Sequence, residues 1–233
     1  MPQPHIHSLA TYNSIKGVAR AAPRLASGLA RHMKVAENAS FHPDAEYLLD
    51  VPHVLTYIPK INEILASHLP PEVYSMIPGA KSFPGVTYRF VSDIKHWEGS
   101  RDYAINGLQY IKDNTEPGSE KRNKLLADLI GYVGHAVTDR FYHALVNFLA
   151  VDHWKLHTVQ TFGEHKGIET DVDAGALGRL GKNPFTFGLS SRIKCHADYS
   201  GRTLDPDIRE FIEEVMAKTY RKIFTDYDLG YDD

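Results

Sequence analysis

A histidine, an aspartate and a second histidine follow one another at four-residue intervals near the middle of the chain. They are His135, Asp139 and His143, in the stretch GYVGHAVTDRFYHAL, residues 131–145. Residues four apart on a helix have neighbouring side chains, with about 5–6 Å between their Cβ atoms. Because imidazole nitrogens and carboxylate oxygens are common zinc ligands, two of these residues could bind one metal ion while the third reaches a second ion.

A second set of the same residue types follows in the stretch EHKGIETDVDA, residues 164–174. It places His165 and Glu169 four residues apart, with Asp173 one turn further along. A single pair of this kind is more often a solvated surface pair than a ligand pair. Two such sets on neighbouring helices favour a shared metal site.

The apolar residues of the first of these two segments support a competing interpretation. They predict a core-facing stripe that leaves His135, Asp139 and His143 on a different face of the helix, open to water. The predicted stripe consists of Leu126, Ile130, Val133, Val137 and Phe148.

Helical periodicity extends over much of the chain and predicts an all-α protein. The first helical region, Leu9 to Glu37, is expected to break at Pro23. The longest helix, residues 120–151, follows Ser119 as its expected N-cap. Further helices are predicted over Tyr57 to Ser67, Arg101 to Lys112, His153 to Asp173 and residues 205–224.

The remaining segments complete the predicted organisation. Residues 175–188 form an expected glycine-rich loop, and a short strand over residues 86–91 would have no partner strand. The acidic tail, residues 226–233, is expected to fray. The sequence therefore predicts a single multi-helix domain over residues 1–233.

Composition argues against several classes of protein. A formal net charge of -3 and the lack of a basic run argue against an electrostatic nucleic-acid partner. Cys195 is the single cysteine, which excludes an internal disulfide and a cysteine-rich zinc ribbon. No signal-peptide pattern and no apolar run of about 18 residues occurs, so we expect a cytoplasmic protein without a transmembrane segment. The sequence makes no prediction of oligomeric state.

Several catalytic motifs do not occur in the chain. There is no His-Asp dipeptide, no His-Glu-x-x-His and no Gly-x-x-x-x-Gly-Lys-Ser/Thr, which disfavours the enzyme classes built on those motifs. The two segments carry no Glu-x-x-His pair, which argues against a di-iron bundle. No Gly-x-Ser-x-Gly elbow occurs either.

The order of the ligand-type residues resembles that of the zinc-dependent phospholipase C family. The likeness lies in His135 and Asp139, then His143 followed by a small residue, then HKGIE from His165 to Glu169. It implies an all-helical bundle with a cluster of zinc ions in a cleft. It further implies that His135 and Asp139 bind a first zinc ion, and that His143, His165 and Glu169 bind a second.

The same resemblance points to residues upstream. It implies a ligand just before the preceding helix, for which His96 in SDIKHWEG is the match, with Asp93 as an acidic partner. It also implies an N-terminal histidine at a third metal, for which His7 is preferred over His5. The chain begins MPQP, whereas secreted members of the family carry a tryptophan ligand there, so two or three ions are both compatible with the pattern.

Other histidines are alternatives to these. His153 and His157 also lie four apart and are interpreted as part of the helix that leads to His165. His42 could contribute together with Asp44 or Asp50, and spacing does not choose between these acids.

The resemblance implies a metal-dependent phosphoesterase that acts on a phospholipid or a related phosphoester. Zinc lowers the pKa of a bound water towards about 7, and paired ions stabilise phosphoryl oxygens. Asp93 would orient the attacking water. Iron or manganese also suits a set of histidines and carboxylates. Two alternatives remain: a catalytically inactive metal-binding protein, and a metal-free helical interaction module.

Overall fold

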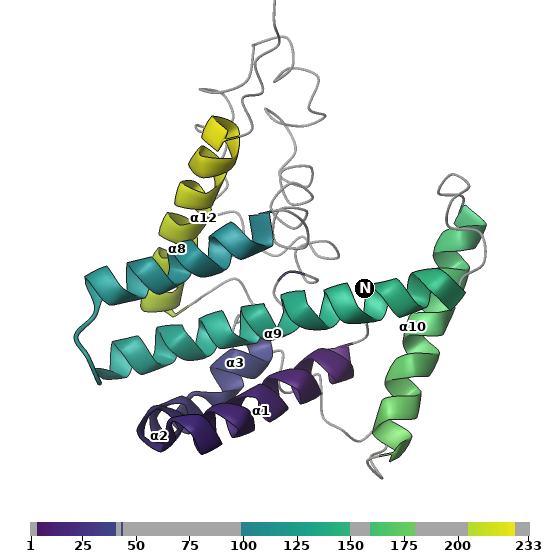
Figure 1. The fold of residues 1–233 in the computed structure, drawn as a ribbon, viewed down its shortest axis with the longest axis horizontal. Coiled ribbons are helices and arrows are strands. Elements are labelled where there is room, and N and C mark those ends of the chain that lie inside the picture. The colour runs from purple at the N-terminus through teal and green to yellow at the C-terminus, as the bar shows by residue number, and fades with distance from the viewer. Residues whose placement is uncertain (1–3, 41–42, 44–98, 150–158, 180–204, 227–233) are drawn as a thin grey trace, which may run out of the picture.

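The computed structural model describes residues 4–40, 43, 99–149, 159–179 and 205–226. Within these ranges the chain forms helices and no strand, which confirms the predicted all-α class (Figure 1). The helices are α1 (Pro4–Ala21), α2 (Pro23–Arg31), α3 (Met33–Ala39), α8 (Gly99–Asn114), α9 (Glu120–Leu149), α10 (Val159–Arg179) and α12 (Pro206–Asp226).

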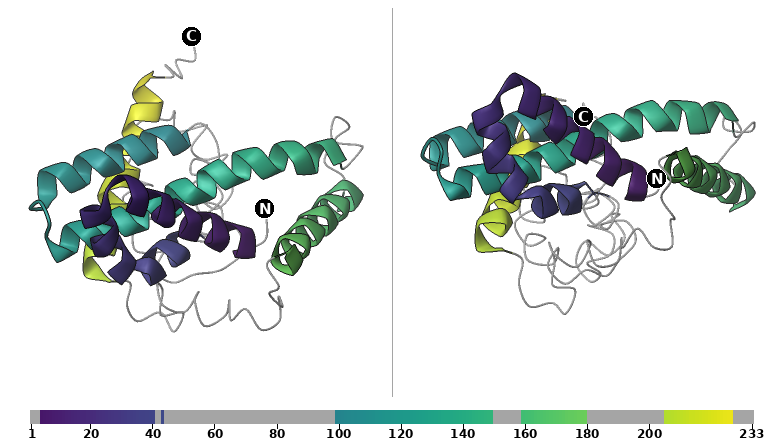
Figure 2. Two further views of the ribbon diagram at one scale, coloured as in Figure 1. Left: turned by 60° about the horizontal axis from the view of Figure 1, so that its bottom comes forward. Right: turned by 90° about the horizontal axis from the view of Figure 1, so that it is seen from below.

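The helix α9 is the central element, and all the other described helices contact it. Its 30 residues correspond to roughly 45 Å of length. Ser119 caps its start as predicted, because the Ser119 hydroxyl accepts a hydrogen bond from the backbone N–H of Arg122 at 3.2 Å. Figures 1 and 2 show α1, α2 and α3 on one side of α9, and the start of α1 close to α10.

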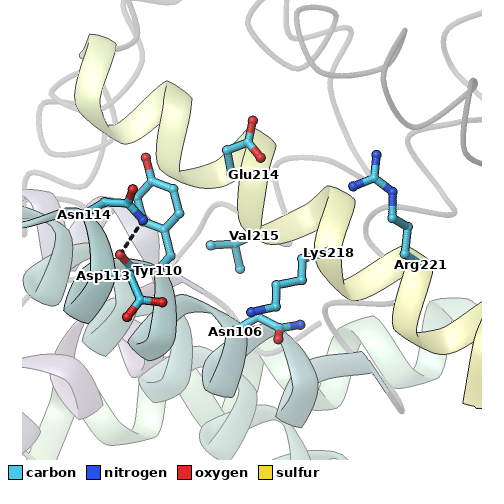
Figure 3. Close-up of a pocket in the computed structure, with 8 residues that line it drawn as sticks. All are labelled: Asn106, Tyr110, Asp113, Asn114, Glu214, Val215, Lys218 and Arg221. Atoms are coloured by element: carbon cyan, nitrogen blue, oxygen red, sulfur yellow. Dashed lines mark hydrogen bonds between the residues drawn. The ribbon is translucent and has the colours of Figure 1, made fainter.

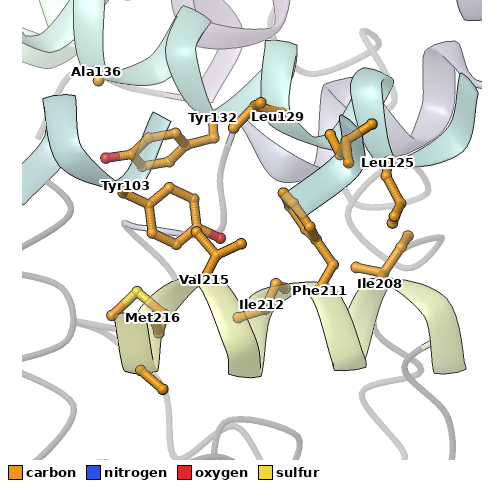
Figure 4. Packing of buried hydrophobic residues seen from close by; sticks show 12 residues of the cluster. Tyr103, Leu125, Leu129, Tyr132, Ala136, Ile208, Phe211, Ile212, Val215 and Met216 are labelled. Atoms are coloured by element: carbon orange, nitrogen blue, oxygen red, sulfur yellow. The ribbon is translucent and has the colours of Figure 1, made fainter. Parts of the chain in front are cut away.

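The main apolar core lies where α12 crosses α8 and α9 (Figure 4). Phe211, Ile212 and Val215 of α12 pack there against Leu125 and Leu129 of α9. These side chains are almost completely buried, and burying each one stabilises the fold by about 1.5–3 kcal/mol. The core therefore fixes the N-terminal half of α9.

A second and smaller apolar cluster joins the N-terminal helices to α9. It consists of Ile15, Leu29, Ala36 and Ala127, from α1, α2, α3 and α9. Its two alanines let α3 and α9 approach closely. None of the described helices combines the length and the hydropathy that crossing a membrane requires.

The helix boundaries differ from the predicted ones in two places. The break at Pro23 is confirmed, but a second break occurs at His32, whose φ of -109° and ψ of 22° separate α2 from α3. The helix α10 continues to Arg179, through the start of the loop expected from residue 175. Leu177 explains the extension, because its side chain is buried and anchors this last turn. The predicted helix over Tyr57 to Ser67 and the strand over residues 86–91 lie outside the described residues.

The predicted apolar stripe of α9 is wrong at Val133 and Val137. The side chain of Val137 is 62% exposed and that of Val133 is 37% exposed, whereas His135 and Asp139 are buried. The reason is that α1 and α3 cover the face of α9 that carries these polar residues. On this part of α9 the polar residues His135 and Asp139 are therefore buried, and the apolar residues Val133 and Val137 are exposed.

Candidate metal centre

Three ligand-type side chains from two helices meet beside α9. They are His7 of α1 and His135 and Asp139 of α9, each offering one ligand atom within 4.8 Å of the others. The two histidines have no exposed surface and Asp139 has 5%. Burying a charged or polar group is costly unless it is paired or bound to a metal, so this group requires a compensating interaction.

The distances in this group suit a zinc ion. The Nε2 atom of His7 lies 3.5 Å from Oδ1 of Asp139, and Nε2 of His135 lies 3.8 Å from Oδ2 of the same carboxylate. The imidazole rings of His7 and His135 stack with their centroids 4.2 Å apart. Tetrahedral zinc with ligands at about 2.0–2.2 Å places neighbouring ligand atoms roughly 3.3–3.6 Å apart. The first distance lies within this range and the second slightly above it, and the donor set of two imidazoles and one carboxylate suits the ion that the resemblance implies.

A backbone carbonyl fixes the tautomer of His135. The Nδ1 atom of His135 lies 2.9 Å from the carbonyl oxygen of Ser40, directly after α3. Because a carbonyl oxygen only accepts hydrogen bonds, Nδ1 carries the proton and Nε2 keeps its lone pair. Metal-bound histidines commonly use their second nitrogen in this way. His135 is thus oriented with Nε2 towards Asp139.

Two glycines let the neighbouring helices come close enough to build the site. An ideal Cβ atom at Gly134 would lie 2.7 Å from Oγ1 of Thr11, and one at Gly131 would lie 2.1 Å from the carbonyl oxygen of Ala36. A side chain at Gly131 would push the α3 backbone outward, and one at Gly134 would displace the Thr11 hydroxyl of α1. The GYVG stretch therefore brings α1 against the helix surface that carries His135.

The helix α10 adds two buried carboxylates next to α1. Glu169 and Asp173 lie four residues apart and are 1% and 4% exposed. The Oδ1 atom of Asp173 accepts a hydrogen bond of 2.8 Å from the backbone N–H of Ile6, the residue before His7. Asp173 of the second predicted set is therefore attached to the residue that precedes His7. Neither acid belongs to the group of mutually close ligand atoms found among the described residues.

The structure does not describe every predicted site residue. Asp93 and His96 lie outside the described residues, as do the alternatives His42, His153 and His157. His143 and His165 lie within the helices α9 and α10, but their side chains are not among those described.

The sequence interpretation assigned His7 to a third metal ion and His135 to a first, and the structure places both histidines beside the Asp139 carboxylate. That interpretation missed Thr11 and Ser40, whose roles depend on tertiary contacts. The signal that was present is the glycine pair 131 and 134, which marks the side of α9 where helices approach closely.

A polar cavity of about 220 Å³ lies elsewhere, between α8 and α12 (Figure 3). Acidic and basic side chains both line it, among them Asp113, Glu214, Lys218 and Arg221. Burial and the neighbouring Glu210 carboxylate raise the pKa of its Tyr110 to about 12, so this phenol stays protonated. Among the described residues that line the cavity there is no histidine, and they offer no metal-ligand set comparable with His7, His135 and Asp139.

Similarity to a known protein family extends over most of the chain. A family model described as zinc-dependent phospholipase C matches residues 7–224, a range that begins at His7 and contains the whole described group. No curated protein and no solved structure matches the chain.

Proposed function

Because the chain belongs to the zinc-dependent phospholipase C family, we propose that it hydrolyses phosphodiester bonds at the centre formed by His7, His135 and Asp139. The observation that carries this proposal is the buried convergence of two imidazoles and one carboxylate from helices far apart in the sequence.

The residues of the centre have distinct tasks in this proposal. His7 and His135 would bind through neutral nitrogens, and the Ser40 carbonyl keeps His135 in the required tautomer. Asp139 would bind as a carboxylate and offset part of the positive charge. A bound zinc ion supplies a water ligand with a pKa near 7 and polarises a phosphoryl oxygen.

The proposal extends to residues that complete a multinuclear site. His143, His165 and Glu169 would bind a second zinc ion, and His96 would complete the first. Asp93 would orient the attacking water as a general base. Glu169 is buried, and its helix α10 contacts both α1 and α9, which supports this assignment. The substrate class proposed is a phospholipid or a related phosphoester.

Metal content and turnover test this function together. Protein purified without nickel affinity should contain at least one zinc ion per chain by elemental analysis, and the zinc-loaded form should hydrolyse a chromogenic phosphodiester. His135→Ala should reduce the rate about 100-fold or more, because it removes one ligand and its Ser40 contact. His32→Ala is the matched control, since His32 pairs with Glu120 at the other end of α9 and should leave the rate unchanged.

The outcomes separate the proposal from its two alternatives. Zinc binding without turnover above His135→Ala, across a panel of phosphodiesters and phospholipids, would identify an inactive metal-binding protein. Less than one zinc, iron or manganese ion per chain would identify a metal-free helical module. Iron or manganese in place of zinc, with turnover retained, would correct the metal and keep the reaction.

A further inference from the structure

The first turn of α1 is held by an acid from a distant part of the chain. Asp173 of α10 is 4% exposed, and its Oδ1 atom accepts the backbone N–H of Ile6 at 2.8 Å. Ile6 belongs to the first turn of α1, which begins at Pro4. The next residue is His7, which lies in the candidate metal centre.

Helix physics explains why an acid belongs at this position. The first N–H groups of an α-helix have no acceptor within the helix. The aligned peptide dipoles also give the N-terminus a partial positive charge that favours a nearby carboxylate. The first turn of α1 contains no acidic residue of its own. Asp173 therefore supplies from α10 the negative charge that α8, α9 and α12 carry in their own first turns.

This contact and one other hold α1 on both sides of His7. Before His7, Asp173 binds Ile6. After it, Thr11 lies against the glycine surface of α9, where a Cβ at Gly134 would be 2.7 Å from the Thr11 hydroxyl oxygen. The position of the His7 imidazole relative to Asp139 thus depends on both attachments.

We propose that Asp173 is a positioning residue of the metal centre, which holds His7 against His135 and Asp139 by capping α1. This inference rests on the proposed binding of zinc at that centre. Asp173 acts through the backbone of Ile6 and not as a ligand. Its removal should therefore weaken metal binding only as far as His7 contributes to it.

Zinc affinity, measured by competition with a coloured chelator, tests the inference without requiring turnover. Asp173→Ala should weaken zinc binding about tenfold, as loss of supporting contacts around metal sites commonly does. Asp173→Asn keeps an acceptor oxygen and loses only the charge, so its loss should be about threefold. Asp171→Asn is the matched control, because Asp171 lies on the same helix and is exposed. It should bind zinc as the wild type does.

A double-mutant cycle with His7→Ala separates positioning from direct ligation. If Asp173 acts through His7, adding Asp173→Ala to His7→Ala causes no further loss of zinc affinity. A further tenfold loss in that background, or wild-type affinity in Asp173→Ala, would overturn the inference. Circular dichroism checks the fold of each variant, and Asp173→Asn decides the question if Asp173→Ala does not fold.

The readout also keeps this inference distinct from the proposed enzymatic function. A wild-type protein that binds zinc but hydrolyses no phosphodiester would refute the function and leave the role of Asp173 measurable. Absence of zinc binding by the wild type would overturn both.

Discussion

Replacing Gly131 by alanine would force α3 away from α9 and disturb the support of His135. The added Cβ atom would lie 2.1 Å from the Ala36 carbonyl oxygen and 2.8 Å from the Ala39 Cβ. Ordinary van der Waals contacts begin at 3.4 Å, so the carbonyl would have to retreat by about 1.3 Å. The atoms that must move belong mainly to the α3 backbone, and they cannot turn aside as a flexible side chain can.

The expected loss follows from two opposing effects. Alanine is a better helix former than glycine by about 1 kcal/mol. Overpacking costs about 1–3 kcal/mol and occasionally more, and a clash with helix backbone belongs at the upper end of that range. We therefore expect Gly131→Ala to lower the free energy of unfolding by about 2 kcal/mol, which lowers the Tm of a chain of this size by roughly 4–8 °C.

Thermal unfolding of the metal-free protein, followed by circular dichroism, measures this loss. Gly167→Ala is the control, because a Cβ there meets nothing within 4 Å, and it should raise the Tm slightly. Gly134→Ala should fall between the two, since it meets mainly the hydroxyl oxygen of the Thr11 side chain. Zinc affinity should also decrease in Gly131→Ala, because Ser40 follows α3 and its carbonyl orients His135. A Tm of Gly131→Ala equal to or above that of the wild type would refute the close approach of α3 to α9.

Two further substitutions test other parts of the structure. Val137→Asn should change the free energy of unfolding by less than about 0.5 kcal/mol, because Val137 is exposed. Leu129→Ala in the core should lower it by about 2–5 kcal/mol. Urea unfolding measures both variants, and similar losses in the two would mean that Val137 faces the core. A hydrogen bond from Lys124 holds the pKa of Asp207 below its usual 3.8, so the pair stabilises the fold above that pH and its contribution is lost as the pH falls through the lower folded value. Asp207→Asn should therefore be less stable than the wild type by roughly 0.5–1 kcal/mol near neutral pH. The difference should shrink as the pH falls below 3.8, and a difference that stays constant or grows there would contradict this assignment.

The sequence predicted those helices whose signals are local. The start of α9 follows from Ser119, whose hydroxyl bonds the first turn, and the break between α1 and α2 follows from Pro23. The break at His32 has no such signal. It depends on how α2 and α3 pack against α9, where His32 lies 2.9 Å from the Glu120 carboxylate. Local sequence signals therefore predicted these helix boundaries, whereas tertiary packing determined where α2 ends and α3 begins.

The orientation of α9 could not be predicted from hydrophobic periodicity, because part of its buried face is polar. His135 is satisfied there by the Ser40 carbonyl, and the Thr138 hydroxyl donates to the Gly134 carbonyl at 2.6 Å. Periodicity identifies a buried face only where burial is apolar. The large apolar side chain of Phe141, on the same helix, is by contrast 72% exposed.

Different kinds of contact predominate along α9, and the candidate metal centre lies where α9 meets the start of α1. Apolar packing with α12 and α8 determines the N-terminal half, and Ile15 ties α1 to the same region. Nearer the start of α1, ligand-type and hydrogen-bonded groups connect the helices: Asp173 to Ile6, and His7 to Asp139. Apolar contacts tolerate small displacements, whereas hydrogen bonds and metal ligands require defined distances and directions. Hydrogen bonds and ligand-type groups therefore hold α1, α9 and α10 at defined distances where they meet, as a metal centre requires. The apolar core meanwhile holds the N-terminal half of α9 in place.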